Sequence, residues 1–196
     1  IITSKIEHPA ILETCKELEK EGFEVSYISV DENGQINLEE LKNAIRPTTI
    51  LISVMFANNE IGTIEPIKEI GEIAKEHKIY FHTDAVQAVG NLKIDVQELN
   101  IDSLSLSGHK FYGPKGIGVL YMRTGVNFQK FVAGGHQERN KRAGTENVPG
   151  IVGLASALEC AYNTMDEHNK KIKELRDYYE SEVKAKIPYM KINGDI

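Results

Sequence analysis

The sequence contains no tryptophan and only two cysteines, and its apolar residues never form a long run. Cys15 and Cys160 fall in separate helical patterns, so their spacing indicates neither a disulfide framework nor a Cys-x-x-Cys zinc site. We expect both to be small buried side chains on apolar helix faces. A membrane-spanning helix needs roughly 18 consecutive apolar residues, and no segment approaches that length. These absences favour a globular protein of a reducing cytoplasm.

The charge balance lacks the basic excess that is typical of nucleic-acid-binding proteins. The chain has 23 lysines and arginines against 29 aspartates and glutamates, a net charge of −6, and its basic residues are scattered. Because a phosphate backbone attracts clustered positive charge, this distribution argues against a nucleic-acid partner. The spacing of His77, His136 and His168 is too wide for a metal cluster. We therefore expect no nucleic-acid, membrane or metal partner.

Apolar segments of strand length alternate with helical patterns along most of the chain. This order predicts an α/β fold with a mainly parallel sheet sandwiched by helices. We interpret residues 1–165 as part of a large domain, and residues 166–196 as a connecting helix and the start of a smaller C-terminal domain. The predicted strands are residues 1–4, 23–30, 49–56, 79–84, 102–106 and 116–123, and the predicted helices are residues 9–20, 66–77, a short one from Asn37 and a long one from Val148.

Polar residues follow three of the predicted strands on the same side. Residues 58–60 come after one strand, Asp84 ends the next, and residues 107–110 follow the third. In an open α/β sheet, ligands bind outside the carboxyl ends of the strands. The sequence therefore predicts a binding site at this edge of the sheet.

Lys110 and Asp84 form the most informative pair in the sequence. A lysine held at a strand end can form a Schiff base with a carbonyl cofactor. A carboxylate at a neighbouring strand end is the partner that the protonated pyridine nitrogen of pyridoxal phosphate (PLP) needs. Each residue alone has an ordinary explanation, as a surface lysine or a helix-capping aspartate. The two in this order, together with their neighbours, favour a PLP site.

Residues near this pair match the other needs of PLP. Ser107 and His109 flank the lysine and can donate hydrogen bonds to phosphate oxygens. Gln87 lies three residues after Asp84, within reach of the 3-oxygen of the ring if the chain turns helical there. His8, at a strand-to-helix junction, is a candidate to stack on the ring. Taken alone, His8 is better explained as an ordinary residue at the start of a helix.

Five motifs in chain order resemble the cysteine desulfurases of the NifS/IscS branch, within the fold-type I, class V aminotransferase family of PLP enzymes. The resemblance extends over residues 1–196. The motif Arg142-Ala-Gly-Thr-Glu-Asn, without proline after the threonine, is more similar to this branch than to the SufS-like one. The five motifs are Glu7-His8, Asn58–Gly62, His82–Gln87, Ser105–Lys110 and Gly134–Thr145.

The resemblance implies a role for each site residue and a large domain of the fold-type I PLP-dependent transferases. Lys110 would carry the cofactor and move protons, Asp84 would hold the pyridine nitrogen, and His8 would stack on the ring and transfer protons. The implied cofactor-binding and substrate-binding residues are Gln87 at the 3-oxygen, Asn59 near the substrate carboxylate, Ser107 and His109 at the phosphate, and Thr145 at the phosphate of the other subunit in a homodimer.

The resemblance also implies an activity, which is the removal of sulfur from L-cysteine to give L-alanine and an enzyme-bound persulfide. The sulfur would pass to iron–sulfur scaffold or tRNA-thiolation proteins. The phosphate-binding turn would precede residue 1 and the nucleophilic cysteine would follow residue 196, so we expect a piece of a longer protein that lacks turnover alone. Two alternatives remain, namely another class V enzyme, such as a selenocysteine lyase or a small-amino-acid aminotransferase, and a non-catalytic cofactor-binding or dimerising domain.

Overall fold

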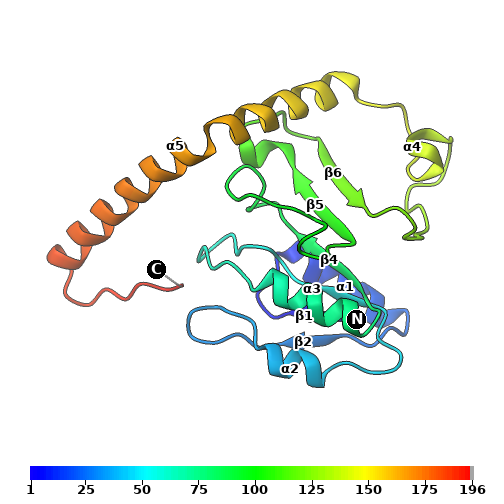
Figure 1. Cartoon of the computed structure of the whole chain (residues 1–196), viewed down its shortest axis with the longest axis horizontal. Helices are drawn as coiled ribbons and strands as arrows, with labels where there is room; N and C mark the ends of the chain where they lie inside the picture. Colours follow the sequence, from blue (N-terminus) through cyan, green and yellow to red (C-terminus); the bar gives the residue numbers. More distant parts are fainter. Residues whose placement is uncertain (195–196) are drawn as a thin grey trace.

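The computed structural model describes residues 1–194, which fold around one six-stranded sheet (Figure 1). The strand order is β2-β1-β3-β4-β5-β6. Strands β1 to β5 are parallel, and β6 is antiparallel to β5, so the prediction of a mainly parallel sheet is confirmed. The strands are β1 (Ile2–Ser4), β2 (Ser26–Ile28), β3 (Leu51–Ser53), β4 (Tyr80–Asp84), β5 (Ser103–Ser107) and β6 (Gly118–Met122).

Helices connect the strands, and several begin where the sequence signals predict. Helix α1 starts with a proline, whose fixed φ and missing N–H suit a first turn. Helices α2 and α5 start after the asparagine caps Asn37 and Asn147, whose side chains accept backbone N–H groups of the first turn. The helices are α1 (Pro9–Lys20), α2 (Leu38–Asn43), α3 (Ile67–Glu76), the 3-10 helix η1 (Gly108–Phe111), α4 (Gln137–Asn140) and α5 (Val148–Lys186).

The two faces of the sheet differ in chemistry. The register places Ile2, Ile52 and Phe81 side by side on one face, where all three are fully buried and belong to the same core as the isoleucines of α3. Burying a side chain such as that of Phe81 contributes roughly 2–3 kcal/mol. Strand β5 alternates, so Leu104 and Leu106 join this core while its serines lie on the opposite face.

Strand β3 is shorter than the predicted strand 49–56, yet the chain beyond it stays beside β4. Val54 and Phe56 donate their backbone N–H groups to the carbonyls of His82 and Asp84, at 3.2 and 2.8 Å. Both side chains are buried, which agrees with the continuous apolar run in the sequence. This extension brings the following asparagines to the carboxyl edge of the sheet.

Helix α5 packs on the sheet with its first half and projects beyond it with its second (Figure 1). Leu154 lies in the core, and the side chain of Asn169 still donates to the carbonyl of Asn91 at 2.7 Å. Beyond this point apolar side chains such as Leu175 are exposed. The helix is continuous across residue 165, so the division into two domains stays a prediction. Within the described residues, no helix combines the length and the apolarity needed to cross a membrane.

Candidate active site

The carboxyl ends of the parallel strands meet at one edge of the sheet and bring most of the predicted site residues there. Strand β1 leads to His8, the extension of β3 leads to Asn59, and β4 ends at Asp84. Strand β5 ends at Ser107, and η1 with Lys110 follows directly. Because β4 and β5 pair with each other, the carboxylate and the amine leave adjacent strands at the same edge.

Asp84 is held at the end of β4 by a tight turn. The residue is 9% exposed, and its Oδ1 accepts the backbone N–H of Val86 at 3.0 Å. The backbone N–H of Ala85 donates to the carbonyl of Ser105 at 3.0 Å, which joins the turn to β5 and starts the segment that carries Gln87. Within residues 1–194, only Oδ1 of this carboxylate accepts a hydrogen bond. The second oxygen is therefore left for a ligand.

Lys110 lies on η1, which contacts two other segments of the chain. The N–H of Gly108 donates to the carbonyl of Ile117 at 3.0 Å, which ties η1 to the segment before β6. Helix α5 supplies the second support, because a Cβ on Gly108 would lie 3.1 Å from the side chain of Leu154 as well as from that of Ile117. Lys110 itself is exposed and forms no ion pair within the described chain. Its amine is thus available on a rigid support.

The residues on either side of Gly108 contact each other. Ser107 Oγ lies 2.9 Å from Nδ1 of His109. Since Nδ1 is engaged, Nε2 is the ring nitrogen of His109 that remains for a ligand. Ser107, His109 and the following lysine thus offer hydrogen-bond donors at one end of the site, as a phosphate group requires.

His8 and Asn59 are both exposed at this edge. Hydrogen bonds hold His8 itself and Asn58, the residue before Asn59. His8 is the N-cap of α1, and its Nδ1 accepts the backbone N–H of Ala10 at 3.1 Å. Asn58 is buried, and its Nδ2 donates to the carbonyl of Ile6 at 2.9 Å, which joins the loop after β3 to the loop after β1. Sequence reasoning singled out Asn59 and missed this bridging role of Asn58.

Thr145 stands apart from the other predicted site residues. It is exposed in the segment between α4 and α5, two residues before the Asn147 cap. Within the described residues, no hydrogen bond joins its side chain to the carboxyl edge of the sheet. Its predicted contact is with another subunit, and it stays a prediction.

Two buried carboxyl groups that the sequence did not single out lie near the predicted site. Glu7 and Glu65 are 4% and 3% exposed. Burial raises the pKa of each carboxyl group from 4.5 to about 7, and the charge of Asp84 raises the pKa of Glu7 as well. The position next to His8 was the available sequence signal for Glu7. The burial of Glu65 results from packing between distant segments, which local patterns do not report.

His82 lies two residues before Asp84, on the same face of β4. Its Nδ1 is 2.8 Å from Oγ of Ser53 on the neighbouring strand. Burial lowers the pKa of His82, and the opposing charge of Asp84 raises it to a smaller extent. The motif His82–Gln87 includes this ring, but the sequence did not predict that it would be partly buried.

The residues at this edge fit PLP. The cofactor needs an accessible amine, a carboxylate with a free oxygen for the pyridine N–H, and donors for a phosphate dianion. Lys110 and Asp84 provide the first two, and the pair Ser107 and His109 keeps one donor beyond the hydrogen bond between them. Within residues 1–194, no group of three or more histidine, cysteine, aspartate or glutamate side chains has the arrangement of a metal site.

The two cysteines differ from each other. Cys15 is buried on α1 as predicted, and burial raises the pKa of its thiol. Cys160 is exposed, so the prediction of a buried side chain was wrong. The side of α5 that faces the sheet carries Leu154, Leu158 and Ala161, and Cys160 lies off this stripe.

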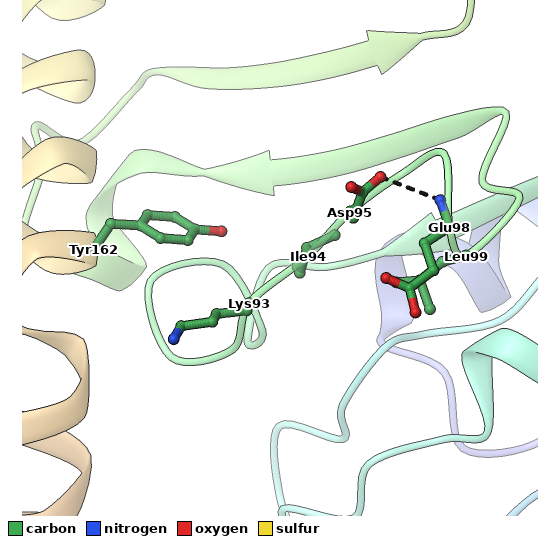
Figure 2. A pocket seen from close by; sticks show the side chains of 6 residues that line it. All are labelled: Lys93, Ile94, Asp95, Glu98, Leu99 and Tyr162. Carbon is green, nitrogen blue, oxygen red and sulfur yellow. Dashed lines mark hydrogen bonds between the residues drawn. The ribbon is translucent and has the colours of Figure 1, made fainter.

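A shallow pocket lies between α5 and the segment that leads into β5 (Figure 2). Tyr162 extends from α5 toward this segment, and its hydroxyl donates to the carbonyl of Leu92 at 3.4 Å. The carboxylate of Asp95 accepts the backbone N–H of Glu98 at 3.1 Å, which stabilises a local turn. None of the predicted site residues is among the lining residues, which are Lys93, Ile94, Asp95, Glu98, Leu99 and Tyr162.

Known sequences match this chain along nearly its whole length. The sequence profile described as aminotransferase class-V matches residues 1–195. Cysteine desulfurase IscS of Clostridium botulinum is 61% identical over 194 residues, which are 99% of this chain and 49% of that protein. Cysteine desulfurase IscS of Methanosarcina thermophila is 62% identical over 194 residues, which are 99% of this chain and 48% of that protein. The chain therefore spans about half the length of the curated relatives it matches.

Solved structures match the fold as well. A NifS-like protein superposes with a TM-score of 0.90 at 45% sequence identity, and the match covers 92% of this chain and 50% of the chain of that protein. A structure described as SspA in complex with cysteine has a TM-score of 0.79 at 51% sequence identity, and the match covers 81% of this chain and 46% of the chain in that structure. Since the profile, the relatives and the fold agree, the chain belongs to the class-V aminotransferase family.

Proposed function

We propose that the full-length protein is a PLP-dependent cysteine desulfurase, which converts L-cysteine to L-alanine and a protein-bound persulfide. The observation that carries this proposal is the position of Asp84 and Lys110 at the ends of adjacent strands, with donors for phosphate beside the lysine. The relatives named cysteine desulfurase, at 61% and 62% identity, support the substrate and the reaction.

Bound PLP would supply an electron-withdrawing ring that stabilises negative charge at the substrate carbon. Lys110 Nζ would hold the cofactor covalently and then take the proton from the α-carbon of the substrate. Asp84 would keep the proton on the pyridine nitrogen through its free carboxylate oxygen, because a nearby negative charge favours the protonated ring. These two roles explain why an exposed amine and a largely buried carboxylate face one edge.

The remaining residues would orient the cofactor and the substrate. His8 would lie against the ring, Gln87 would reach its 3-oxygen, and Asn59 would lie near the substrate carboxylate. Ser107 and His109 would bind the phosphate, and Thr145 would bind the phosphate in the other subunit of a homodimer. These roles follow from the family motifs and from the positions of the strand ends.

The proposal extends to the partners and to the rest of the protein. A cysteine thiolate outside this chain would receive the sulfur, which would then pass to an iron–sulfur scaffold or a tRNA-thiolation protein in the cytoplasm. Cys15 is unsuited to this role because a buried thiol with a raised pKa is neither accessible nor ionised. Residues 1–165 would form part of the large domain, and residues 166–196 would lead into a smaller C-terminal domain.

The experiment measures alanine released from L-cysteine by the full-length protein in the presence of PLP and a reductant. We expect turnover by the wild type, loss of turnover in Lys110→Ala, and retention in Lys115→Ala, which removes an exposed lysine from the same loop. Alanine release that persists in Lys110→Ala would overturn the assignment of the lysine. Absence of release by the wild type would overturn the desulfurase function itself.

A further inference from the structure

Glu7 occupies a central position behind the carboxyl edge of the sheet. A single oxygen, Oε1, accepts the hydroxyl of Ser4 at 2.7 Å and the backbone N–H of Met55 at 2.8 Å. Ser4 is the last residue of β1, and Met55 lies in the buried extension of β3. One carboxylate therefore joins the turn after β1 to the chain after β3.

The residue before Glu7 is fixed as well. The carbonyl of Ile6 accepts the side-chain N–H of Asn58 at 2.9 Å. The Oδ1 of Asn58 accepts the backbone N–H groups of Glu60 and Ile61, at 2.9 and 3.0 Å. Ile6 is thus bound to the loop after β3 and Glu7 to the extension of β3, and these contacts limit the movement of the backbone that leads to His8.

The side chain of His8 is constrained by its own contact. Its Nδ1 accepts the backbone N–H of Ala10 at 3.1 Å, which satisfies one of the free N–H groups at the start of α1. A ring nitrogen that accepts a hydrogen bond carries no proton, so the proton of the neutral ring lies on Nε2. This contact defines both the orientation of the ring and its tautomer.

The burial of Glu7 is unfavourable in isolation. Its second oxygen, Oε2, is buried and has no hydrogen-bond partner in the described chain. An apolar side chain would avoid this unpaired oxygen, but it would leave the N–H of Met55 and the hydroxyl of Ser4 without this acceptor. The unpaired oxygen lowers the local stability of the core, whereas the hydrogen bonds of Oε1 fix the position of the turn that leads to His8.

We propose that Glu7 is a positioning residue that fixes His8 and its Nε2-protonated ring at the cofactor site. The proposal rests on the proposed function, because the contact of His8 with the cofactor is part of that function. Glu7 would not touch the substrate or the cofactor. It would act through the turn Ser4–His8, and its removal would loosen the ring of His8 rather than prevent covalent attachment of PLP.

The chain offers a conservative variant and a matched control. Glu7→Gln keeps an acceptor oxygen for Ser4 and Met55, so it should hold the ring of His8 as the wild type does. Glu7→Ala removes that acceptor. Glu65→Ala removes a carboxyl group that is equally buried and also accepts one backbone N–H, that of Ile36 at 2.9 Å. Glu65 has no hydrogen bond to the turn at His8, so it controls for the general loss of a buried carboxyl group.

Two readouts on the full-length, PLP-loaded protein test the proposal. Nitrogen NMR with labelled histidine should show one Nε2-protonated tautomer of His8 in the wild type, Glu7→Gln and Glu65→Ala, and averaged nitrogen signals in Glu7→Ala. Visible circular dichroism, which reports how the bound ring is held, should fall several-fold in Glu7→Ala while the absorbance of bound PLP remains. If Glu7→Ala does not fold, Glu7→Asp, which is one methylene shorter, should show the same changes.

Each outcome is informative. Unchanged His8 signals and circular dichroism in Glu7→Ala, or in Glu7→Asp if Glu7→Ala does not fold, would overturn the positioning role, whatever the enzyme does. Equal changes in Glu65→Ala would also overturn it, because they would assign the effect to general destabilisation. Covalent PLP that persists in Lys110→Ala would instead contradict the proposed function and leave the NMR result on His8 interpretable.

Discussion

The stability of the fold should decrease as the pH rises toward neutrality, because Glu7 is buried. In the unfolded chain its carboxyl group titrates near 4.5, and in the folded protein burial raises the pKa to about 7. Between these values the folded state binds more protons than the unfolded state, so the free energy of unfolding falls with increasing pH. Below the unfolded pKa both states are protonated, and this contribution to stability is fully present.

The magnitude follows from the displacement of the pKa. Each pH unit corresponds to 1.36 kcal/mol, so ionising Glu7 in the folded state costs about 3 kcal/mol by pH ~8. This is a large fraction of the 5–15 kcal/mol that is typical of the stability of a domain. Burial raises the pKa of Glu65 in the same direction, so the wild type should show a combined effect.

A comparison with Glu7→Gln isolates the contribution of Glu7. Glutamine keeps the acceptor for Met55 and resembles the protonated acid, and the difference between variant and wild type cancels the titrations that do not depend on the charge of Glu7. Urea unfolding of both proteins, from pH about 5 to about 8, should show Glu7→Gln gaining up to about 3 kcal/mol over the wild type as the pH rises. A difference that stays constant over this range, or that changes in the opposite direction, would refute the argument.

Three further predictions concern other parts of the chain. Asp84→Asn should keep the covalent attachment of PLP but reduce alanine formation by at least about tenfold, because a neutral amide no longer favours the protonated pyridine nitrogen; equal turnover would contradict this role. Gly71→Ala should lower the free energy of unfolding by about 1–3 kcal/mol, since a Cβ on α3 would collide with the carbonyl of Leu99; urea unfolding of this variant beside the wild type measures the loss, and equal stability would contradict the close approach of the two segments. Cys160→Ser should remove one fast-reacting thiol from the folded protein in a thiol-reagent assay, whereas Cys15→Ser should not; the reverse pattern would contradict the exposure of the two side chains.

Local sequence patterns predicted the elements that are fixed by local physics. Pro9 and Asn37 mark helix starts because their backbone geometry and side-chain acceptors act within one turn. The alternation of strands and helices predicted the mainly parallel sheet, and hence the shared edge of Asp84 and Lys110. The apolar run 49–56 predicted burial correctly for residues 52–56 but not for Ile50, which is exposed, and only its middle forms β3.

The features that were missed depend on contacts between distant segments. The exposure of Cys160 is decided by which side of α5 faces the sheet, and a helix of mixed composition leaves that choice open. Glu7 and Glu65 are buried by loops that follow other strands, and charged residues in a sequence are normally expected at the surface. The antiparallel direction of β6 likewise follows from the short turn after η1 rather than from the composition of the strand itself.

The most direct test of the account is the identification of the lysine that binds PLP. The full-length protein is incubated with PLP, reduced with borohydride, digested, and analysed by mass spectrometry. We expect a PLP-derived adduct on the peptide that contains Lys110, with Lys115 unmodified and no adduct in Lys110→Ala. An adduct on a different lysine, or no adduct in the wild type, would contradict the assignment of this edge of the sheet as a PLP site.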